Sequence, residues 1–427
     1  EEIAYGCLED LTKRNLIMVS NKRYDGKITG CRIHDLLREL CIRQAEEQKF
    51  IYHNKDGIFS EGISKARRIS ITSQLSIRSM NPGQFSLHTT FCFVEDYDFI
   101  DRLMSMPWKL LRVLDMKAFE LRKFPPGLSQ LYHLRYLDVT YRYTAGPYIP
   151  EDISNLENLE TFMVDSSPFY PEAPLSFTRF WTMKNLRHAV INNYVRLPDP
   201  RSQRFPLENL LTLSKLHNFC CSEEVVELIP NLKTIYVKYN LDWEDLHYYH
   251  LNNFCRFRNL ESFTVEFEFK NKIFSNPFVG WLVLPSSLRR LTIARCSGCI
   301  LWEGISAAIG SLPNLEYLKF QDVIFCGDVW ETREGDFQNL RELEMDYVTL
   351  ERWKTESSSH FPNLERLVMR SCDYLAEVPD CIGDIATLQL INVYDCSEVV
   401  NEWARRIREE QREMGNEILE IEVTDMK

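Results

Sequence analysis

Along most of this chain a leucine recurs every 22 to 28 residues, and most copies are followed by apolar residues three and five positions later. The eleven intervals cover 277 residues and average about 25. Such a period predicts a stack of similar coils rather than one globular core. The leading leucines are Leu111, Leu134, Leu159, Leu186, Leu210, Leu232, Leu260, Leu288, Leu315, Leu340, Leu364 and Leu388.

The period lies in the range of leucine-rich repeats. Positions three and five belong to a short strand whose inward side chains stack on those of the next coil, because one coil alone buries too little apolar surface to fold. Two degenerate copies, Ala66 with Ile69 and Ile71, and His88 with Phe91 and Phe93, extend the series to as many as fourteen coils. The sequence therefore predicts an α/β solenoid, a leucine-rich-repeat horseshoe with a parallel β-ribbon.

A second pattern predicts how each coil returns to the next strand. A proline followed by apolar residues at three-residue spacing favours a helical or 3₁₀ turn on the outer side. The three copies are Pro125, Leu128, Leu131, Leu134; Pro150, Ile153, Leu156, Leu159; and Pro379, Ile382, Ile385, Leu388.

Residues 1–50 have a different pattern. We predict a helix over residues 3–14, a strand over 16–20, a turn at Tyr24, Asp25 and Gly26, a strand over 28–33 and a helix from Asp35. This order is that of the C-terminal part of a winged-helix domain. We expect a linker over 51–65, about 12 clear repeats and up to 14 over 66–397, and an amphipathic cap over 398–427.

Composition limits the kinds of partner and the cellular location that we expect for this chain. The chain has 50 basic and 62 acidic residues, and its net charge of −12 opposes nonspecific binding to nucleic acid. No run approaches 18 apolar residues, so we expect no transmembrane segment. The thirteen cysteines are an odd number without paired spacing near either end, and no N-x-S/T sequon occurs; both observations favour a reducing, intracellular location. Because Glu1 stands where Met would begin a chain, we expect a fragment or a processed product.

The stretch from Gly30 to Ile42 contains Ile33, His34 and Asp35 before an amphipathic helix. It resembles the end of the nucleotide-binding region of plant intracellular immune receptors, close to the late-blight-resistance type of coiled-coil NLR. In that family the tripeptide is Met-His-Asp, and repeats and an amphipathic tail follow. The resemblance implies that His34 faces the β-phosphate of ADP in the full-length receptor, and that Asp35 helps to hold the winged helix against the nucleotide-binding domain.

The sequence contains no phosphate-binding loop of the form G-x-x-x-x-G-K-[ST], and no H-E-x-x-H, G-x-S-x-G or dinucleotide fingerprint. We therefore expect no enzymatic activity and no cofactor for this chain alone, with ADP or ATP bound only by the full-length receptor. The resemblance implies a cytoplasmic location, with the nucleus or a membrane surface as alternatives for the whole receptor.

Three residue groups have a competing interpretation. Cys296 and Cys299 form a C-x-x-C pair, but Cys296 lies eight residues after Leu288, at the repeat's own Asn/Cys position, which argues against metal or redox chemistry. Basic residues in the predicted wing, Lys22, Arg23 and Lys27, suggest DNA binding, which the acidic surroundings oppose. Asp35 is also a good N-cap for its helix, which would leave His34 an ordinary turn residue.

Residues that flank the inward pair project onto the exposed face of the ribbon, where we expect protein partners. Tyr and Arg are common interface anchors, although for any single residue a solvated polar surface is the favoured interpretation and the face as a whole is the stronger candidate. The expected partners are a pathogen effector, a host protein or the nucleotide-binding domain of the same receptor. The alternatives are a ubiquitin-ligase substrate adaptor, in which residues 1–50 would be an F-box, and an extracellular repeat receptor. The candidates are Tyr136, Asp138, Tyr236, Lys238, Arg290, Tyr317, Lys319, Glu342, Glu344, Arg366, Arg370 and Tyr394.

Overall fold

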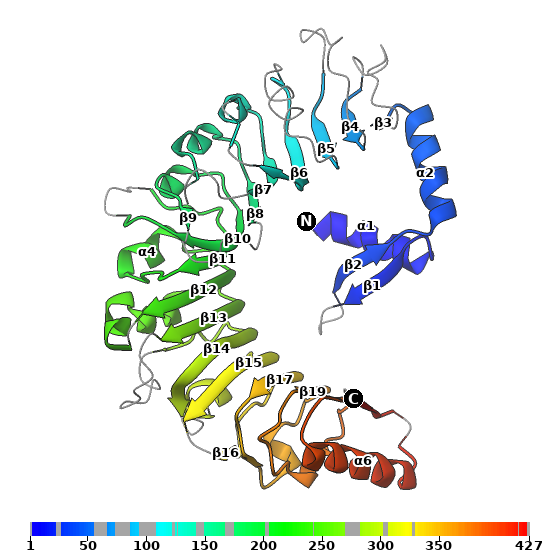
Figure 1. The fold of residues 1–427 in the computed structure, drawn as a ribbon, viewed down its shortest axis with the longest axis vertical. Coiled ribbons are helices and arrows are strands. Elements are labelled where there is room, and N and C mark those ends of the chain that lie inside the picture. Colours follow the sequence, from blue (N-terminus) through cyan, green and yellow to red (C-terminus); the bar gives the residue numbers. More distant parts are fainter. Residues whose placement is uncertain are drawn as a thin grey trace. The chain divides into compact units, whose positions relative to one another are not determined.

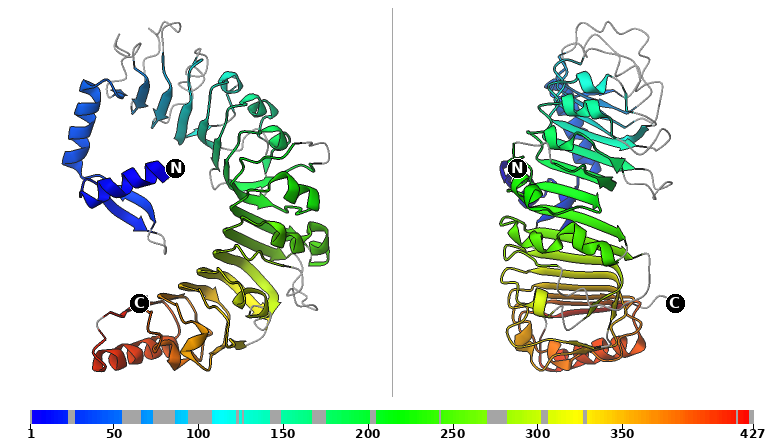
Figure 2. Two further views of the ribbon diagram at one scale, coloured as in Figure 1. Left: turned by 180° about the vertical axis from the view of Figure 1, so that it is seen from behind. Right: turned by 90° about the vertical axis from the view of Figure 1, so that its left-hand side faces the viewer.

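The computed structural model forms two compact units, residues 1–170 and 171–427 (Figures 1 and 2). In both units the dominant element is a parallel β-ribbon, so the predicted solenoid is confirmed. The structure describes residues 2–22, 27–54, 66–72, 86–93, 108–121, 124–125, 127–141, 149–166, 175–200, 205–241, 243–269, 282–301, 306–326, 329–416 and 418–424.

A small helix and strand segment precedes the ribbon in the first unit. Helix α1 (Glu2–Lys13) is followed by an antiparallel pair of strands, β1 (Met18–Lys22) and β2 (Ile28–Arg32), and by helix α2 (Asp35–Glu47). The backbone N–H of Ile28 donates to the Tyr5 hydroxyl at 2.8 Å, which ties the sheet to α1. The predicted turn at 24–26 lies outside the described residues, as do Arg23 and the side chain of Lys22.

The ribbon of the first unit begins earlier than the sequence predicts. Strand β3 (Tyr52–Asn54) lies inside the stretch expected to be a linker and pairs in parallel with β4 (Arg68–Ile71). The ribbon continues through β5 (Thr89–Cys92), β6 (Val113–Leu121), β7 (Tyr136–Tyr141) and β8 (Thr161–Ser166). Residues 55–65 lie outside the described part of the chain.

The predicted register of the coil at β5 is wrong by one residue. Thr90 is buried and pairs with Ile69 on one side and Leu114 on the other, whereas Phe93 is 57% exposed. The inward residues are therefore Leu87, Thr90 and Cys92 instead of His88, Phe91 and Phe93. Because strand side chains alternate between faces, a shift of one residue exchanges the whole inward set for the outward one.

In the second unit the ribbon is longer, and its consecutive strands pair in parallel (Figure 1). Leu291, Leu318, Leu343, Leu367 and Ile391 pair in sequence and are fully buried, as the repeat predicts. A separate parallel pair, β16 (Val329–Glu331) and β18 (Arg352–Lys354), lies beside the ribbon. The ribbon strands are β9 (Leu175–Ser176), β10 (His188–Arg196), β11 (Thr212–His217), β12 (Thr234–Leu241), β13 (Ser262–Phe269), β14 (Arg290–Leu301), β15 (Tyr317–Cys326), β17 (Glu342–Val348), β19 (Arg366–Arg370), β20 (Leu390–Tyr394) and β21 (Glu420–Thr424).

Short helices return the chain from strand to strand. The three proline patterns form the predicted 3₁₀ turns, at η4 (Leu128–Gln130), η5 (Glu151–Asn155) and η12 (Asp380–Ile382). The other return elements are η6 (Phe180–Thr182), α4 (Glu223–Leu228), η7 (Trp243–Tyr249), η8 (Leu251–Arg256), the π-helical turn η10 (Ser306–Gly310) and η11 (Ser358–His360).

Asparagine side chains link successive coils. Each lies one residue before a leading leucine, and its side-chain N–H donates to a backbone carbonyl of the preceding coil. Asn339, for example, donates to the carbonyl of Pro313 at 2.7 Å. Because the amide satisfies a turn carbonyl that no strand can reach, it fixes the spacing of neighbouring coils. The series comprises Asn158, Asn209, Asn231, Asn259, Asn314, Asn339 and Asn363.

A ladder of charges occupies the position directly after the leading leucines in the second unit. Its sign alternates from coil to coil, and the ion pairs join Lys233 to Glu261 at 2.8 Å, Arg289 to Glu316, and Arg341 to Glu365 at 3.1 Å. We name these six residues the charge ladder. Exposed pairs of this kind each contribute only a few tenths of a kcal/mol.

The chain ends in a helix and a further strand. Helix α6 (Glu398–Glu413) buries Val400, Trp403 and Ile407, whereas Val399 is 47% exposed. A Cβ atom added to Gly383 would lie 2.8 Å from Cγ2 of Ile407, so the helix is seated directly on the preceding 3₁₀ turn. Strand β21 pairs in parallel with β20, which extends the ribbon by one strand.

Candidate functional site: the exposed face of the ribbon

The strand register arranges the predicted partner residues of the second unit in three parallel rows. This exposed face of the ribbon comprises side chains that alternate with the buried ones. The first row contains Arg290, Tyr317, Glu342 and Arg366; the second contains Tyr236, Lys319 and Glu344; and the third contains Lys238, Glu266, Asp346, Arg370 and Tyr394.

Two tyrosines from different strands converge on a single carboxylate, Glu266. The Tyr194 hydroxyl donates to Oε2 of Glu266 at 2.5 Å, and the Tyr236 hydroxyl donates to Oε1. The side chain of Glu266 is 5% exposed, and the Arg295 guanidinium lies 3.8 Å from it. Burial, together with the hydrogen bonds to Glu266, raises the pKa of both tyrosines, so both hydroxyls remain donors. We call Tyr194, Tyr236, Glu266 and Arg295 the tyrosine-glutamate cluster.

Lys238 connects this cluster to the next acidic residue. Its ammonium group lies 4.7 Å from the centre of the Tyr194 ring and 2.7 Å from the Glu268 carboxylate. The side chain of Lys238 is only 14% exposed. Because these partners restrict its rotamers, little conformational entropy remains to be lost when a partner binds this part of the face.

A second group of charges lies on strands β15, β17 and β19. Glu344 accepts from the Tyr317 hydroxyl at 2.9 Å and pairs with Lys319 and Arg370, each at 3.2 Å. Glu342 pairs with Arg366 at 3.4 Å. Arg290 lies over the Tyr317 ring, 4.8 Å from its centre. We call Tyr317, Lys319, Glu342, Glu344, Arg366 and Arg370 the charge cluster.

The two glutamates of the charge cluster have opposite pKa shifts. Burial raises the pKa of Glu342 to about 7, Arg366 opposes the shift, and Glu344 adds to it. For Glu344 burial acts in the same direction, but Lys319, Tyr317 and Arg370 outweigh it and lower the pKa. As the pH falls through neutrality, the first proton that the pair takes up therefore binds to Glu342, while Glu344 stays ionised.

The shift of Glu342 has a consequence for stability. The folded state holds this proton until about pH 7, whereas an unfolded chain releases it near 4.5. The stabilising contribution is complete below pH 4.5 and is lost as the pH rises to about 7. We therefore expect Glu342→Gln, which mimics the protonated acid, to gain on the order of 1–2 kcal/mol relative to the wild type between about pH 5 and 8.

Urea denaturation of both proteins across this pH range measures the difference. Exposed Glu334→Gln is the matched control and should give a curve parallel to that of the wild type. Parallel curves for Glu342→Gln as well would show that Glu342 is ionised throughout and that the assigned proton is wrong.

In the first unit the predicted pair Tyr136 and Asp138 also lies on the ribbon, with the hydroxyl 3.4 Å from Oδ2. Burial raises the pKa of Tyr136 to about 12, and Asp138 and Asp115 add to the shift. Burial likewise raises the pKa of Asp138, with a further contribution from Asp115. Tyr136, Asp138 and Asp115 therefore form an acidic group on the ribbon of the first unit.

His34 and Asp35 have a structural role that differs from one expectation. The N-cap of α2 is His34, whose Nδ1 accepts from the backbone N–H of Leu36 at 3.3 Å, whereas Asp35 lies in the first turn. The interpretation of Asp35 as the N-cap is therefore wrong. Because Nδ1 accepts a hydrogen bond, neutral His34 carries its proton on Nε2, and the exposed ring edge is a donor.

Three members of the tyrosine-glutamate cluster were not predicted from the sequence: Tyr194, Glu266 and Arg295. Glu266 could have been found, because strand alternation between the inward residues Val265 and Phe267 places it in the same row as Lys238. Arg295 could not, because it reaches Glu266 from a residue with a left-handed backbone, φ 49°. Strand alternation does not extend to such a position.

The geometry gives no support to metal or redox chemistry at the C-x-x-C pair. Cys296 is fully buried, and Cys372 at the equivalent position donates to the carbonyl of Met345 in β17 at 3.6 Å. The side chain of Cys299 lies outside the described residues. Within the described part of the chain, no group of three or more His, Cys, Asp or Glu residues could hold a metal ion. No described helix is long and apolar enough to span a membrane.

Comparison with known proteins agrees with this architecture. A family model described as "Leucine-rich repeat region" matches residues 91–372. One late blight resistance protein homolog of Solanum demissum is 32% identical over 97% of this chain, and the late blight resistance protein R1-A of the same species is 30% identical over 97%. The matches span 32% and 33% of those proteins, so the chain corresponds to about a third of their length. A solved leucine-rich-repeat protein of Leptospira interrogans aligns with 87% of this chain and 99% of its own, with TM-score 0.41 and 15% identity.

The repeat period, the parallel ribbon and the family match define a leucine-rich-repeat protein, and the chain belongs to that family. Within it, the chain is homologous to the repeat-bearing part of plant late blight resistance proteins, the disease-resistance NLRs that the motif at Ile33 to Asp35 resembles. No catalytic domain is evident among the described residues.

Proposed function

We propose that this chain is the recognition and regulatory portion of a plant disease-resistance receptor. In this proposal the exposed face of the ribbon binds a pathogen-derived or host protein, or the nucleotide-binding domain of the same receptor, and thereby restrains the nucleotide-driven switch. The observation that carries the proposal is the tyrosine-glutamate cluster, where two tyrosines are held on a buried carboxylate beside an exposed arginine. Rigid tyrosines with arginine are frequent hot-spot residues.

The homology favours this function over a ubiquitin-ligase adaptor. The match to late blight resistance proteins covers 97% of the chain, so it includes most of residues 1–50, where the adaptor would require an F-box. The exposed Nε2 edge of His34 supports the proposed contact with the β-phosphate of ADP in the full-length receptor, because an N–H group can donate to an anion. We place the receptor in the cytoplasm.

A binding measurement with a defined partner tests the proposal. We expect the chain to bind the separately expressed nucleotide-binding domain of a late blight resistance receptor, and Arg295→Ala and Arg370→Ala each to weaken binding about tenfold. Both arginines are well exposed, with side-chain values of 60% and 41%, so their removal should leave the fold intact.

Exposed Arg412→Ala on helix α6 is the charge-matched control and should bind like the wild type. Equal loss in all three variants would indicate a general charge effect and would refute the assigned face. Binding of a ligase scaffold in place of the nucleotide-binding domain would support the adaptor.

A further inference from the structure

Two cysteines occupy equivalent positions in consecutive coils near the end of the second unit. Cys372 lies two residues after strand β19, and Cys396 lies two residues after β20. The last residues of these two strands pair with each other. The residue that follows has a left-handed backbone in both coils, φ 47° at Ser371 and 51° at Asp395. The two coils therefore leave the ribbon in the same way, and the cysteines lie side by side.

The contacts of the two cysteines confirm that they are neighbours. The backbone N–H of Cys372 donates to Sγ of Cys396 at 3.5 Å. Each thiol donates to the carbonyl two residues earlier, Cys372 to Arg370 and Cys396 to Tyr394, both at 3.5 Å, so the two side chains have the same orientation. Neighbouring strands lie about 4.8 Å apart, within the range of about 4.4–6.8 Å that separates the Cα atoms of a disulfide. The spacing of the coils therefore permits a disulfide between them.

One of the two thiols is accessible and activated, and the other is protected. Cys396 is half-buried, whereas Cys372 is only 1% exposed. A hydrogen bond from the Cys372 thiol lowers the pKa of Cys396, and together with the Cys372 backbone N–H it outweighs the opposite effect of burial. The same contact between the thiols, followed by burial, raises the pKa of Cys372 well above its ordinary value. Because the thiolate is the nucleophile, we expect an oxidant to react first at Cys396.

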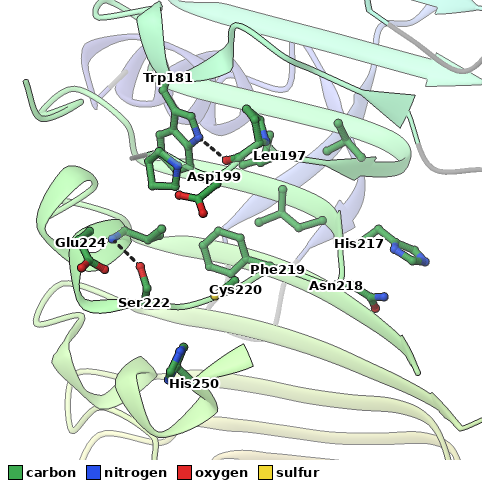
Figure 3. Close-up of a pocket in the computed structure, with 15 residues that line it drawn as sticks. Trp181, Leu197, Asp199, His217, Asn218, Phe219, Cys220, Ser222, Glu224 and His250 are labelled. Carbon is green, nitrogen blue, oxygen red and sulfur yellow. Dashed lines mark hydrogen bonds between the residues drawn. The ribbon is translucent and has the colours of Figure 1, made fainter. Parts of the chain in front are cut away.

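Cys220 shows that exposure alone does not make a cysteine of this chain reactive. It lines a cavity of about 510 Å³ in the second unit (Figure 3). Its side chain is more exposed than that of Cys396, but burial raises the pKa of its thiol, and the carboxylates of Asp199 and Glu224 add to the shift. A raised pKa leaves less thiolate at neutral pH. We therefore expect Cys220 to react with an oxidant more slowly than Cys396.

We propose that Cys372 and Cys396 form a reversible disulfide when the protein meets a peroxide. In the first step the Cys396 thiolate attacks one oxygen of hydrogen peroxide, the O–O bond breaks, and Cys396 becomes a sulfenic acid while the other oxygen leaves as hydroxide and takes up a proton. In the second step the sulfur of Cys372 attacks this sulfenic acid, the S–S bond forms, and the S–O bond breaks to release water that carries the thiol proton of Cys372. The peroxide gains the two electrons that the two sulfurs lose. A dithiol reverses the reaction by thiol–disulfide exchange.

The disulfide would connect two coils at the base of the C-terminal cap. Asn401 of helix α6 donates to the carbonyl of Cys396 at 3.3 Å, and the Ser397 hydroxyl donates to the carbonyl of Leu375 at 2.8 Å. A covalent link at this point restricts the separation of β20 from β19, and we expect it to slow the opening of α6. The inference goes beyond the proposed function, because it requires no partner on the exposed face of the ribbon.

Peroxide treatment of the folded full chain, followed by alkylation of the remaining thiols and peptide mapping, tests the proposal. The protease Asp-N cleaves before aspartate and places Cys372, Cys381 and Cys396 on three separate peptides. We expect the peptides of Cys372 and Cys396 to be recovered as one linked species, and dithiothreitol to separate them again. Mapping of the wild-type protein decides the question without any variant, so the test does not depend on whether a variant folds.

Substitutions identify the order of the two steps. Cys372→Ser should leave the sulfenic acid on Cys396, where dimedone traps it, whereas Cys396→Ser should lower peroxide-dependent modification of Cys372 at least about tenfold. Cys381→Ser removes a half-buried thiol in the intervening turn and is the matched control, which should keep the link. Absence of the link in the folded wild-type protein, or links of Cys381 to either cysteine in equal amount, would overturn the proposal.

Discussion

Replacement of Trp353 by alanine is expected to lower the free energy of unfolding by about 3–5 kcal/mol. Trp353 is fully buried and stacks on Trp330 with ring centres 5.2 Å apart and planes at 13°, while Phe361 meets it edge-on at 5.7 Å. The two tryptophans also pair across β16 and β18. Alanine would leave a cavity among rigid rings that cannot collapse to fill it.

Urea denaturation followed by circular dichroism gives the magnitude, and hydrogen exchange shows where the chain opens. Tyr374→Ala is the control, because Tyr374 is 64% exposed and its removal should change stability by less than about 0.5 kcal/mol. A Trp353→Ala protein as stable as the control would mean that the stacked pair does not form part of the core.

The second large effect concerns the C-terminal cap. We expect Trp403→Ala to cost about 3–5 kcal/mol locally, because Trp403 is 5% exposed on the face of α6 that packs on the last coils. Since each coil is stabilised mainly by its neighbours, the loss should appear first as opening of α6 and β20. Limited proteolysis and hydrogen exchange would detect this opening well below the main unfolding transition.

Val399→Ala supplies the comparison on the same helix. Val399 is 47% exposed, so this variant should keep α6 protected. If Trp403→Ala raised exchange evenly over the whole second unit, the unit would unfold as one block, and nearest-neighbour stabilisation of the end would be the wrong description.

The sequence was sufficient to predict the ribbon because inward leucines recur at a fixed interval, and Leu291, Leu318 and Leu343 are buried as expected. It failed at β5, where Thr90 replaces the usual aliphatic residue and two phenylalanines shift the apparent register by one. Burial inside a ribbon depends on the neighbouring strands, and a threonine can occupy an inward position if they determine the alignment.

For the exposed face, the repeat was enough to predict which residues lie in its rows, but not which residues they contact. Tyr236 and Lys238 were predicted as residues of the exposed face. Their partners Glu266 and Glu268 lie on the next strand, and the sequence does not show which of the two acids each residue contacts. The Asn-Leu dipeptides are a clearer signal of contact. Their asparagines connect consecutive coils through backbone carbonyls, as Asn339 does.

The charge ladder has a consequence for how such a protein can change in length during evolution. Its signs alternate from Lys233 to Glu365, so neighbouring coils within this stretch carry opposite charges. Unequal recombination that removed a single coil would place like charges side by side, whereas removal of two would restore the alternation. Each mismatch is small, but it biases repeat number toward changes in multiples of two, and gains and losses of adjacent pairs should be the easier events to tolerate.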